Sequence, residues 1–419
     1  MRILALNWTD WKSKTAGGSE THLYEMFRRW VSKGHEVTLV CGYHAGLRDA
    51  RNRTHREIDE GIEILRSGPW YLTHRTVPRL ARRLLWWRRF DVILDAVNKL
   101  PLFAPRWAGG TPVLAIVHHL FGKTIERDFG WLQARYYLAL ERRIPRAYGE
   151  TRLIAISPST KRSLVALGLS PERIEVVRCG LEPSYLHPHA VPRSQDPLLL
   201  VISRLRRYKR VDLVLEAFAR LRALLPSAQL WIAGIGADER RLKALARRLG
   251  LGDSVRFLGQ VSEAEKKALL ARAHLLVNAS EVEGWGLTSI EANAYGTPVL
   301  AADSPGLRDS VRDGETGRLF PRGDAGALAR IANEVLTDAR GWERLSGGAR
   351  RWAKRFDWEE TARRTFAILE EVTRGGERPL PPPPLPATAE VLEGDREGVA
   401  REDEARAASE ERVLPVSRD

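Results

Sequence analysis

Cysteine is nearly absent from this chain of 419 residues. The two cysteines, Cys41 and Cys179, stand far apart in the sequence and match no spacing that is typical of a metal site. Neither a disulfide framework nor a cysteine-rich metal centre is therefore expected, and a reducing, cytoplasmic environment fits this composition best.

Long hydrophobic runs are also missing. No stretch approaches the roughly 20 apolar residues that a membrane-spanning helix needs. The apolar run within residues 1–11 is too short for a signal peptide and is instead typical of a buried first strand. With 43% hydrophobic residues, the chain can form the packed cores of two or three domains.

Acidic residues are few relative to basic ones, since 53 Asp and Glu stand against 67 Lys and Arg, and the net charge is +14. Residues 374–419 hold 7 basic and 11 acidic residues, so residues 1–373 carry a net charge of +18. A segment as basic as residues 1–373 attracts phosphate groups. Nucleic acids, anionic membranes and nucleotide sugars all offer phosphates, and charge alone does not rank them.

The most informative stretch is Val277–Gly306, which predicts a strand, a glycine-rich loop, a helix from about Leu287 to Tyr295 and a second strand. The loop is Gly284-Trp285-Gly286. The free N–H groups and positive dipole end of the helix start favour an anion, which the glycines let approach closely. Glu283 stands at the mouth of the loop, and Glu291 lies where it would reach the ribose of a bound nucleoside diphosphate. Two isolated glutamates would more often be a helix cap and a solvated side chain.

Two further segments carry residues that suit a phosphate. Gly17-Gly18 forms a loop before a helix, with Ser19 as the expected N-cap. Arg204 and Lys209 follow the apolar strand Leu198–Ile202, and as fixed cations they can clamp a leaving diphosphate. Charges at a strand end are otherwise typical of a solvated turn.

Two histidines follow a predicted strand, Pro112–Val117. They are His118 and His119, and they stand at the C-terminal end of this strand, where open parallel sheets bind ligands. Adjacent residues on a strand point to opposite faces, so we expect only one of the two imidazoles to face a cleft.

A basic, aromatic segment, His74–Phe90, contains six Arg, Trp86 and Trp87, and no acidic residue. Its apolar residues, Trp87 included, recur at helical spacing. The simplest interpretation is a helix that packs on the core and exposes its arginines to solvent. The alternative is a patch, residues 75–89, that rests on an anionic membrane surface, with Arg on phosphates and Trp at the interface.

The chain resembles the retaining glycosyltransferases of family 4, whose E-x7-E motif matches Glu283 and Glu291. The likeness continues through Gly296-Thr297-Pro298-Val299 and Gly314-Glu315-Thr316-Gly317. It implies the α/β architecture of B-type glycosyltransferases, in which two doubly wound, Rossmann-like domains face each other across a cleft. It also implies transfer of a sugar from a nucleoside diphosphate to an acceptor hydroxyl, with retention at the anomeric carbon.

The resemblance assigns roles to the candidate residues. The implied catalytic residues are His118, with His119 as the runner-up, Glu283, Arg204 and Lys209. The implied donor-binding residues are Gly17, Gly18, Arg204, Lys209, Val261, Gly284, Trp285, Gly286, Leu287 and Glu291. No metal and no other cofactor are expected, because cations would stabilise the leaving diphosphate and the chain lacks the Asp-x-Asp pair with which A-type glycosyltransferases hold a metal.

The composition and the resemblance together predict the domain organisation. An acceptor-side domain covers residues 1–187, a linker 188–197, a nucleotide-sugar-binding domain 198–355, a helix that crosses back to the first domain 356–373, and a disordered, Pro-rich and acidic tail 374–419.

The expected partners are a nucleotide-sugar donor and a glycan or lipid-linked acceptor, in glycan, glycolipid or surface-polysaccharide synthesis. Nucleic acid is not expected, because the basic segments contain no recognition module. The expected location is the cytoplasm, or the inner face of the membrane as a peripheral protein. Two alternatives stay open: a non-hydrolysing sugar-nucleotide epimerase, which shares the architecture, and a nucleotide-sugar-binding or partner-dependent protein that has lost transfer.

Overall fold

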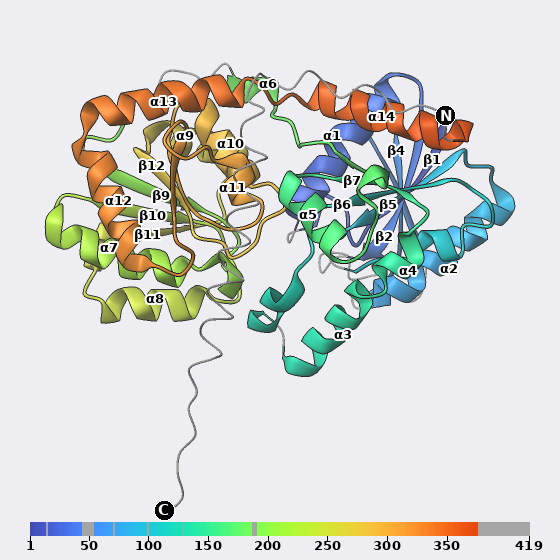
Figure 1. Ribbon diagram of the computed structural model, residues 1–419, viewed down its shortest axis with the longest axis horizontal. Helices are drawn as coiled ribbons and strands as arrows, with labels where there is room; N and C mark the ends of the chain where they lie inside the picture. Colours follow the sequence, from blue (N-terminus) through green and yellow to red (C-terminus); the bar gives the residue numbers. More distant parts are fainter. Residues whose placement is uncertain are drawn as a thin grey trace, which may run out of the picture. The chain divides into compact units, whose positions relative to one another are not determined.

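The computed structural model describes residues 1–13, 16–43, 54–69, 72–98, 100–128, 130–186 and 191–375. These residues form two α/β domains, each built on a largely parallel sheet with helices packed on its faces (Figure 1). This confirms the predicted doubly wound, Rossmann-like fold class.

The first domain contains an eight-stranded sheet in the order β3-β4-β2-β1-β5-β6-β7-β8, as far as the chain is described. Its pairs are parallel apart from β3 with β4. The strands are β1 (Arg2–Leu6), β2 (Glu36–Tyr43), β3 (His55–Asp59), β4 (Ile62–Pro69), β5 (Val92–Val97), β6 (Val113–Val117), β7 (Arg152–Ala155) and β8 (Ile174–Val176). The helices are α1 (Gly18–Ser32), α2 (Thr73–Trp87), α3 (Trp131–Glu141), α4 (Ile144–Tyr148), α5 (Pro158–Ala166) and α6 (Pro183–Leu186). Short 3₁₀ helices are η2 (Ala104–Arg106), η3 (Gly122–Arg127) and η4 (Pro171–Arg173).

The second domain contains a six-stranded parallel sheet in the order β11-β10-β9-β12-β13-β14 among the described residues. The strands are β9 (Leu198–Ile202), β10 (Gln229–Ala233), β11 (Val255–Gly259), β12 (Leu275–Asn278), β13 (Val299–Ala302) and β14 (Gly317–Phe320). The helices are α7 (Val211–Leu224), α8 (Glu239–Arg248), α9 (Glu263–Arg272), α10 (Leu287–Ala294), α11 (Leu307–Ser310), α12 (Ala325–Thr337) and α13 (Ala339–Ala353), with the 3₁₀ helices η5 (Arg207–Lys209) and η6 (Gly252–Ser254). Parallel pairing brings the loops after these strands to one edge of the sheet.

The chain crosses between the domains at two adjacent points. Gly180, which follows β8, packs so closely on the start of α14 (Trp358–Arg374) that a Cβ at this position would lie 2.2 Å from the Trp358 nitrogen. Helix α14 then lies along α1 of the first domain (Figure 1). There the indole N–H of Trp30 donates a 3.0 Å hydrogen bond to the Ala362 carbonyl.

Two predicted segments are only partly described. The linker residues 188–190 and the tail from residue 376 onward lie outside the described residues. Elsewhere in the predicted linker, Arg193 is anchored to the second domain, because its guanidinium donates to the carbonyls of Tyr295 and Gly296 at 2.9 and 3.0 Å and so holds the C-terminal end of α10. Arg374 ends α14, so the first residue of the predicted tail is helical.

Helix α2 confirms the predicted amphipathic helix. Val77 and Ala81 are buried on its inner face, and its arginines face solvent. Trp87 was expected at helical spacing with the apolar residues, but it is 78% exposed, and the neighbouring Trp86 is 89% exposed. None of the described helices combines the length and the apolar character that crossing a bilayer would require.

Candidate active site

The predicted strand–loop–helix–strand unit is present as β12, a loop with Glu283 to Gly286, α10 and β13. Gly286 is the N-cap residue of α10 and has φ of +84°, a conformation that glycine adopts without strain. Gly284 lies against the first domain, because a Cβ on it would be 2.4 Å from the His118 carbonyl oxygen. Gly284 therefore lets this loop approach the opposite domain closely.

Glu283 and Lys209 form an ion pair at the mouth of this loop. Ser280 adds a hydrogen bond of 2.8 Å from its hydroxyl to the Glu283 carboxylate. Burial is the largest single influence on Glu283 and alone would raise its pKa, but the charge and hydrogen bond of Lys209 together with the Ser280 hydrogen bond and His119 lower it overall. For Lys209 burial is the largest single influence and opposes ionisation, but the Glu283 carboxylate and Tyr208 together raise the pKa overall. Both groups therefore stay charged near neutral pH.

Glu291 lies in the second turn of α10 and is held by Lys266 of α9, with 3.0 Å between Lys266 Nζ and Glu291 Oε1. Its other oxygen, Oε2, is buried and has no hydrogen-bond partner among the described residues. A buried carboxylate oxygen without a donor costs free energy, which a ligand hydroxyl would recover. Val261 lies in the loop between β11 and α9, just before Ser262, which caps α9.

The first-domain glycine loop lies opposite these residues. A Cβ on Gly17 would be 3.5 Å from Arg204 Cζ, and one on Gly18 would be 3.1 Å from Leu287 Cδ1. The start of α1, the guanidinium of Arg204 and the start of α10 therefore meet in one place. The prediction that Ser19 caps α1 is wrong, because Gly17 is the N-cap residue and Glu20 accepts a 2.8 Å hydrogen bond from the Gly17 N–H.

The two predicted histidines have different surroundings. His118 is 3% exposed, and its Nε2 lies 3.2 Å from Nδ1 of His22 on α1. His118 Nδ1 is buried without a hydrogen-bond partner in the described part of the chain. His119 is half-buried, and its ring lies 4.4 Å from that of Phe121 between centroids. The assignment of the donor-facing histidine to His118 stays a prediction.

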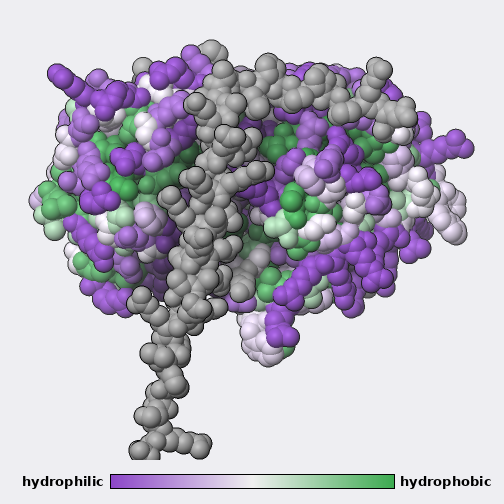
Figure 2. Space-filling view, in the orientation of Figure 1, coloured by the Kyte–Doolittle hydropathy of each residue, from purple (hydrophilic) through white to green (hydrophobic). Residues whose placement is uncertain are grey.

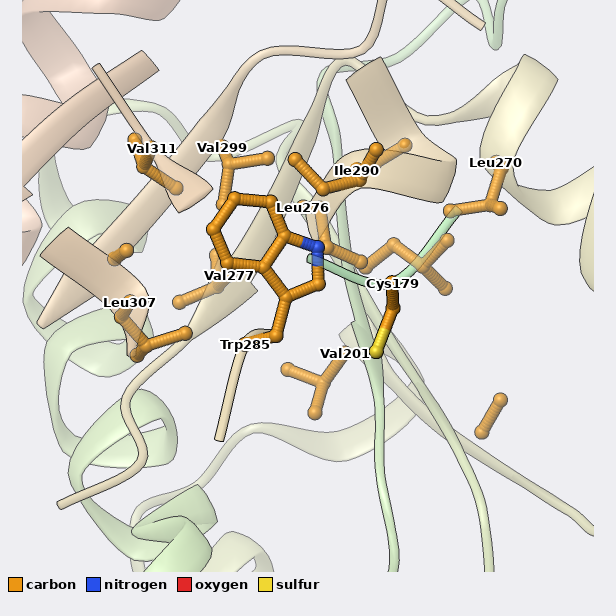
Figure 3. Close-up of a cluster of buried hydrophobic side chains, with 14 of the residues drawn as sticks. Cys179, Val201, Leu270, Leu276, Val277, Trp285, Ile290, Val299, Leu307 and Val311 are labelled. Atoms are coloured by element: carbon orange, nitrogen blue, oxygen red, sulfur yellow. The ribbon is translucent and has the colours of Figure 1, made fainter. Parts of the chain in front are cut away.

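The Trp285 side chain points into a buried apolar cluster (Figure 3). It is 2% exposed and packs among apolar residues of the second domain and Cys179 (Figure 3). The Phe356 ring lies 5.2 Å from it between centroids. The buried indole is therefore not available to a ligand, and a donor-binding role for the main chain of Trp285 stays a prediction.

Several residues near the cleft were not predicted as site residues. Lys266 holds Glu291 and lies on α9. The Ser262–Glu265 capping box could have predicted the start of this helix from the sequence. Gly234 and Gly236, which follow β10, have a packing reason to be glycine. Their hypothetical Cβ atoms would lie 1.9 Å from the Ser203 carbonyl and 2.2 Å from the Leu205 carbonyl. Among the described residues, no group of three or more His, Cys, Asp or Glu side chains is arranged to hold a metal ion.

The two facing α/β domains, with glycine-rich helix starts and cations between them, define the chain as a B-type glycosyltransferase. The family model described as Glycosyltransferase Family 4 matches residues 16–185, and the model described as Glycosyl transferases group 1 matches residues 187–352. The chain belongs to family 4 of the glycosyltransferases.

Curated relatives cover most of the chain. A glycogen synthase of Mycobacterium tuberculosis is 28% identical over 415 residues, which are 92% of this chain and 98% of the relative. The MMP alpha-(1->4)-mannosyltransferase of Mycolicibacterium hassiacum is 27% identical over 411 residues, covering 88% of this chain and 98% of the relative. A D-inositol 3-phosphate glycosyltransferase of Streptomyces bingchenggensis is 34% identical over 246 residues, 54% of each chain.

Solved structures share the fold. Sucrose-phosphate synthase of Thermosynechococcus elongatus superposes with a TM-score of 0.73 at 22% identity, covering 89% of this chain and 99% of that one. HepE of Anabaena, solved with UDP and glucose, has a TM-score of 0.68 at 19% identity, covering 88% and 100%. At these identities the likeness supports the architecture alone.

Proposed function

We propose that this protein is a metal-independent, retaining hexosyltransferase that moves a sugar from a nucleoside diphosphate to an acceptor hydroxyl. The observation that carries this proposal is the charged pair of Lys209 and Glu283 at the start of α10, opposite the Gly17-Gly18 loop. Family membership favours transfer over the epimerase alternative.

The donor site is proposed in three parts. The N–H groups at the start of α10, after Gly284 and Gly286, bind the diphosphate. The free Oε2 of Glu291 accepts hydrogen bonds from the ribose hydroxyls, while Lys266 holds Oε1. The main chain at Val261 lies near the base, and Leu287 and the Gly17-Gly18 loop close the site.

The difficult step is breaking the bond between the anomeric carbon and the diphosphate oxygen. Negative charge grows on the leaving diphosphate, and Arg204, Lys209 and the dipole of α10 stabilise it without a metal. The acceptor oxygen attacks the same face of the sugar, its proton passes to the leaving phosphate oxygen, and the configuration is retained. Glu283 and His118 contact and orient the sugar. Because the acceptor oxygen attacks directly, the reaction needs no nucleophilic side chain.

The names of the relatives support a proposal for the class of acceptor. Their names describe synthesis of glycogen, transfer of mannose and glycosylation of inositol phosphate. We propose a glycan or lipid-linked acceptor, in glycan, glycolipid or surface-polysaccharide synthesis. The acceptor would bind on the first domain, near η3 and α3, where the loop after His118 begins.

A peripheral position on an anionic membrane is a second element of the proposal. Trp86 and Trp87 of α2 stand beside exposed arginines, and Trp131 and Leu132 at the start of α3 are 67% and 69% exposed. Figure 2 shows a hydrophilic surface with pale and green patches where Figure 1 places α2 and α3. Aromatic side chains among arginines suit a lipid interface. Wild-type protein should sediment with anionic vesicles, and Trp86→Ser/Trp87→Ser should do so less. Equal sedimentation with neutral vesicles would contradict the idea.

The first test of the donor site is a thermal-shift screen of UDP, GDP, ADP and their sugars in EDTA. A ligand at 100 times its Kd stabilises the folded state by about 2.7 kcal/mol, so the correct nucleotide should raise Tm. Glu291→Ala should lose this shift. Glu263→Ala is the matched control, because Glu263 also pairs with Lys266 at 3.0 Å but is 59% exposed.

The outcomes separate the alternatives. A nucleotide that stabilises wild type and Glu263→Ala but not Glu291→Ala supports the donor site and names the base. Conversion of the nucleotide sugar to an epimer without acceptor would favour the epimerase. Failure of every nucleotide to raise Tm at millimolar concentration would overturn the proposal.

A further inference from the structure

Two aspartates, one from each domain, contact the opposite domain. Asp128 follows η3 in the first domain, and its Oδ1 accepts a 3.2 Å hydrogen bond from the Arg207 N–H of the second domain. Asp309 lies on α11 in the second domain, and its Oδ2 accepts a 2.7 Å hydrogen bond from the Ser159 N–H of the first domain. Each domain therefore gives a carboxylate to a main-chain N–H of the other.

Both N–H groups lie at helix starts. Arg207 is the first residue of η5, and Ser159 is the second residue of α5. N–H groups in a first turn have no partner within the helix, and a carboxylate there is favoured by hydrogen bonding and by the dipole. The local cap of α5, Ser157, already accepts from Thr160, so the Ser159 N–H is left for Asp309.

Each of these two contacts lies next to one partner of the Lys209–Glu283 ion pair. η5 ends at Lys209, so Asp128 binds the start of the turn that carries this cation. The loop before α11 packs on the segment of Glu283, where the Glu283 N–H donates to the Pro305 carbonyl at 3.0 Å. A Cβ on Gly306 would lie 2.2 Å from the Glu283 carbonyl oxygen, so the two segments pack tightly and leave no room for a side chain here.

Arginines reinforce both contacts. Arg127, next to Asp128, pairs with Glu281 of the second domain at 2.6 Å, and Glu281 also pairs with Arg210 at 3.2 Å. Arg162 of α5 approaches Asp309 at 3.4 Å. The carboxylates of Glu281 and Asp309 are only 8% and 7% exposed, while Arg127 and Arg162 are 50% and 53% exposed, so water screens the arginine side of these pairs.

We propose that Asp128 and Asp309 are positioning residues that hold the two domains closed during sugar transfer. When the domains are closed, Asp128 and Asp309 keep Lys209 and Glu283 in a fixed position relative to the acceptor-side domain. This inference rests on the proposed function and deepens it. The residues proposed to bind the nucleotide lie mainly in the second domain, so losing these contacts should affect turnover more than donor binding.

Kinetics of four aspartate variants and one control test this role. Asp128→Ala and Asp309→Ala should each lower kcat about tenfold, the effect expected for one charge-assisted hydrogen bond, and change the KM for the nucleotide sugar less than about threefold. Asp128→Asn and Asp309→Asn keep an accepting oxygen and should recover most of the activity. Glu126→Ala removes an exposed carboxylate two residues from Asp128 and is the matched control.

A second measurement does not depend on turnover. Small-angle scattering with saturating nucleotide should give a larger radius of gyration for the Asp128→Ala/Asp309→Ala double variant than for wild type, with unchanged circular dichroism. Wild-type kcat and wild-type radius of gyration in the alanine variants would overturn the inference. If wild type transfers no sugar but closes on nucleotide, and the double variant does not, the proposed function fails while the closing role stands.

Discussion

The Nδ1 atom of His22 lies 3.2 Å from the Nε2 atom of His118, and both side chains are buried between α1 and the end of β6. Burial lowers the pKa of His22 to about 3, against an ordinary value of 6.5. Burial, together with His22 and His119, also lowers the pKa of His118. The folded protein therefore keeps this pair neutral while the unfolded chain takes up protons below pH 6.5.

This difference predicts acid sensitivity. The stability that His22 contributes is fully present above pH 6.5 and is lost as the pH falls toward 3, because only the unfolded state binds the proton. At pH 5 the loss from His22 is about 2 kcal/mol. His22→Asn should therefore lose less unfolding free energy than wild type between pH 7.5 and pH 5. Urea unfolding at both pH values measures this, and an equal loss in the two proteins would show that His22 is not the cause.

Gly284 predicts a steric effect on closure. Gly284→Ala would place a methyl group 2.4 Å from the His118 carbonyl and 2.7 Å from Ile156 Cδ1, both in the opposite domain. The variant should fold with nearly unchanged Tm, because the domains can separate slightly, but lose most of its transferase activity. Gly347→Ala on α13 is the control, since a Cβ there would meet only Arg351 Nη1, at an ordinary 3.4 Å. Comparable activity of the two variants would mean that this close approach is unimportant.

Local patterns predicted much of the fold and of the donor loop. The alternation of apolar strands and helices specified two doubly wound domains, and glycines before a helix specified the loop at Glu283, because these signals depend on neighbours in the sequence. The same rules failed at Ser19, where Glu20, already inside the helix, satisfies the Gly17 N–H.

Contacts between distant residues could not be predicted in this way. His22 and His118 are 96 residues apart, and Asp309 and Ser159 are 150 apart, and no local pattern pairs them. The sequence also could not tell whether Trp285 offers its indole or its main chain to a ligand. That distinction depends on which side of the loop packs on the core.

Trp285 predicts a stability effect at the donor loop. Its indole fills the core beneath the start of α10 (Figure 3). Trp285→Ala should lower the unfolding free energy by about 3–5 kcal/mol, the range for truncating a buried aromatic side chain. Trp86→Ala, at a position that is 89% exposed, should change it by less than about 0.5 kcal/mol. Urea denaturation compares the two, and similar values would contradict the buried role of Trp285.

Arg66 predicts the cost of an unpaired buried charge. Its side chain is 0% exposed and donates to Asp10 and to Glu57, each at 2.6 Å. Arg66→Met should lower the unfolding free energy by about 3–5 kcal/mol, because Asp10, also 0% exposed, would keep a buried charge without its cation. Arg66→Met/Asp10→Asn removes that charge and should be more stable than Arg66→Met alone. Urea denaturation of the double-mutant cycle measures the coupling, and additive losses would show that the two residues contribute independently.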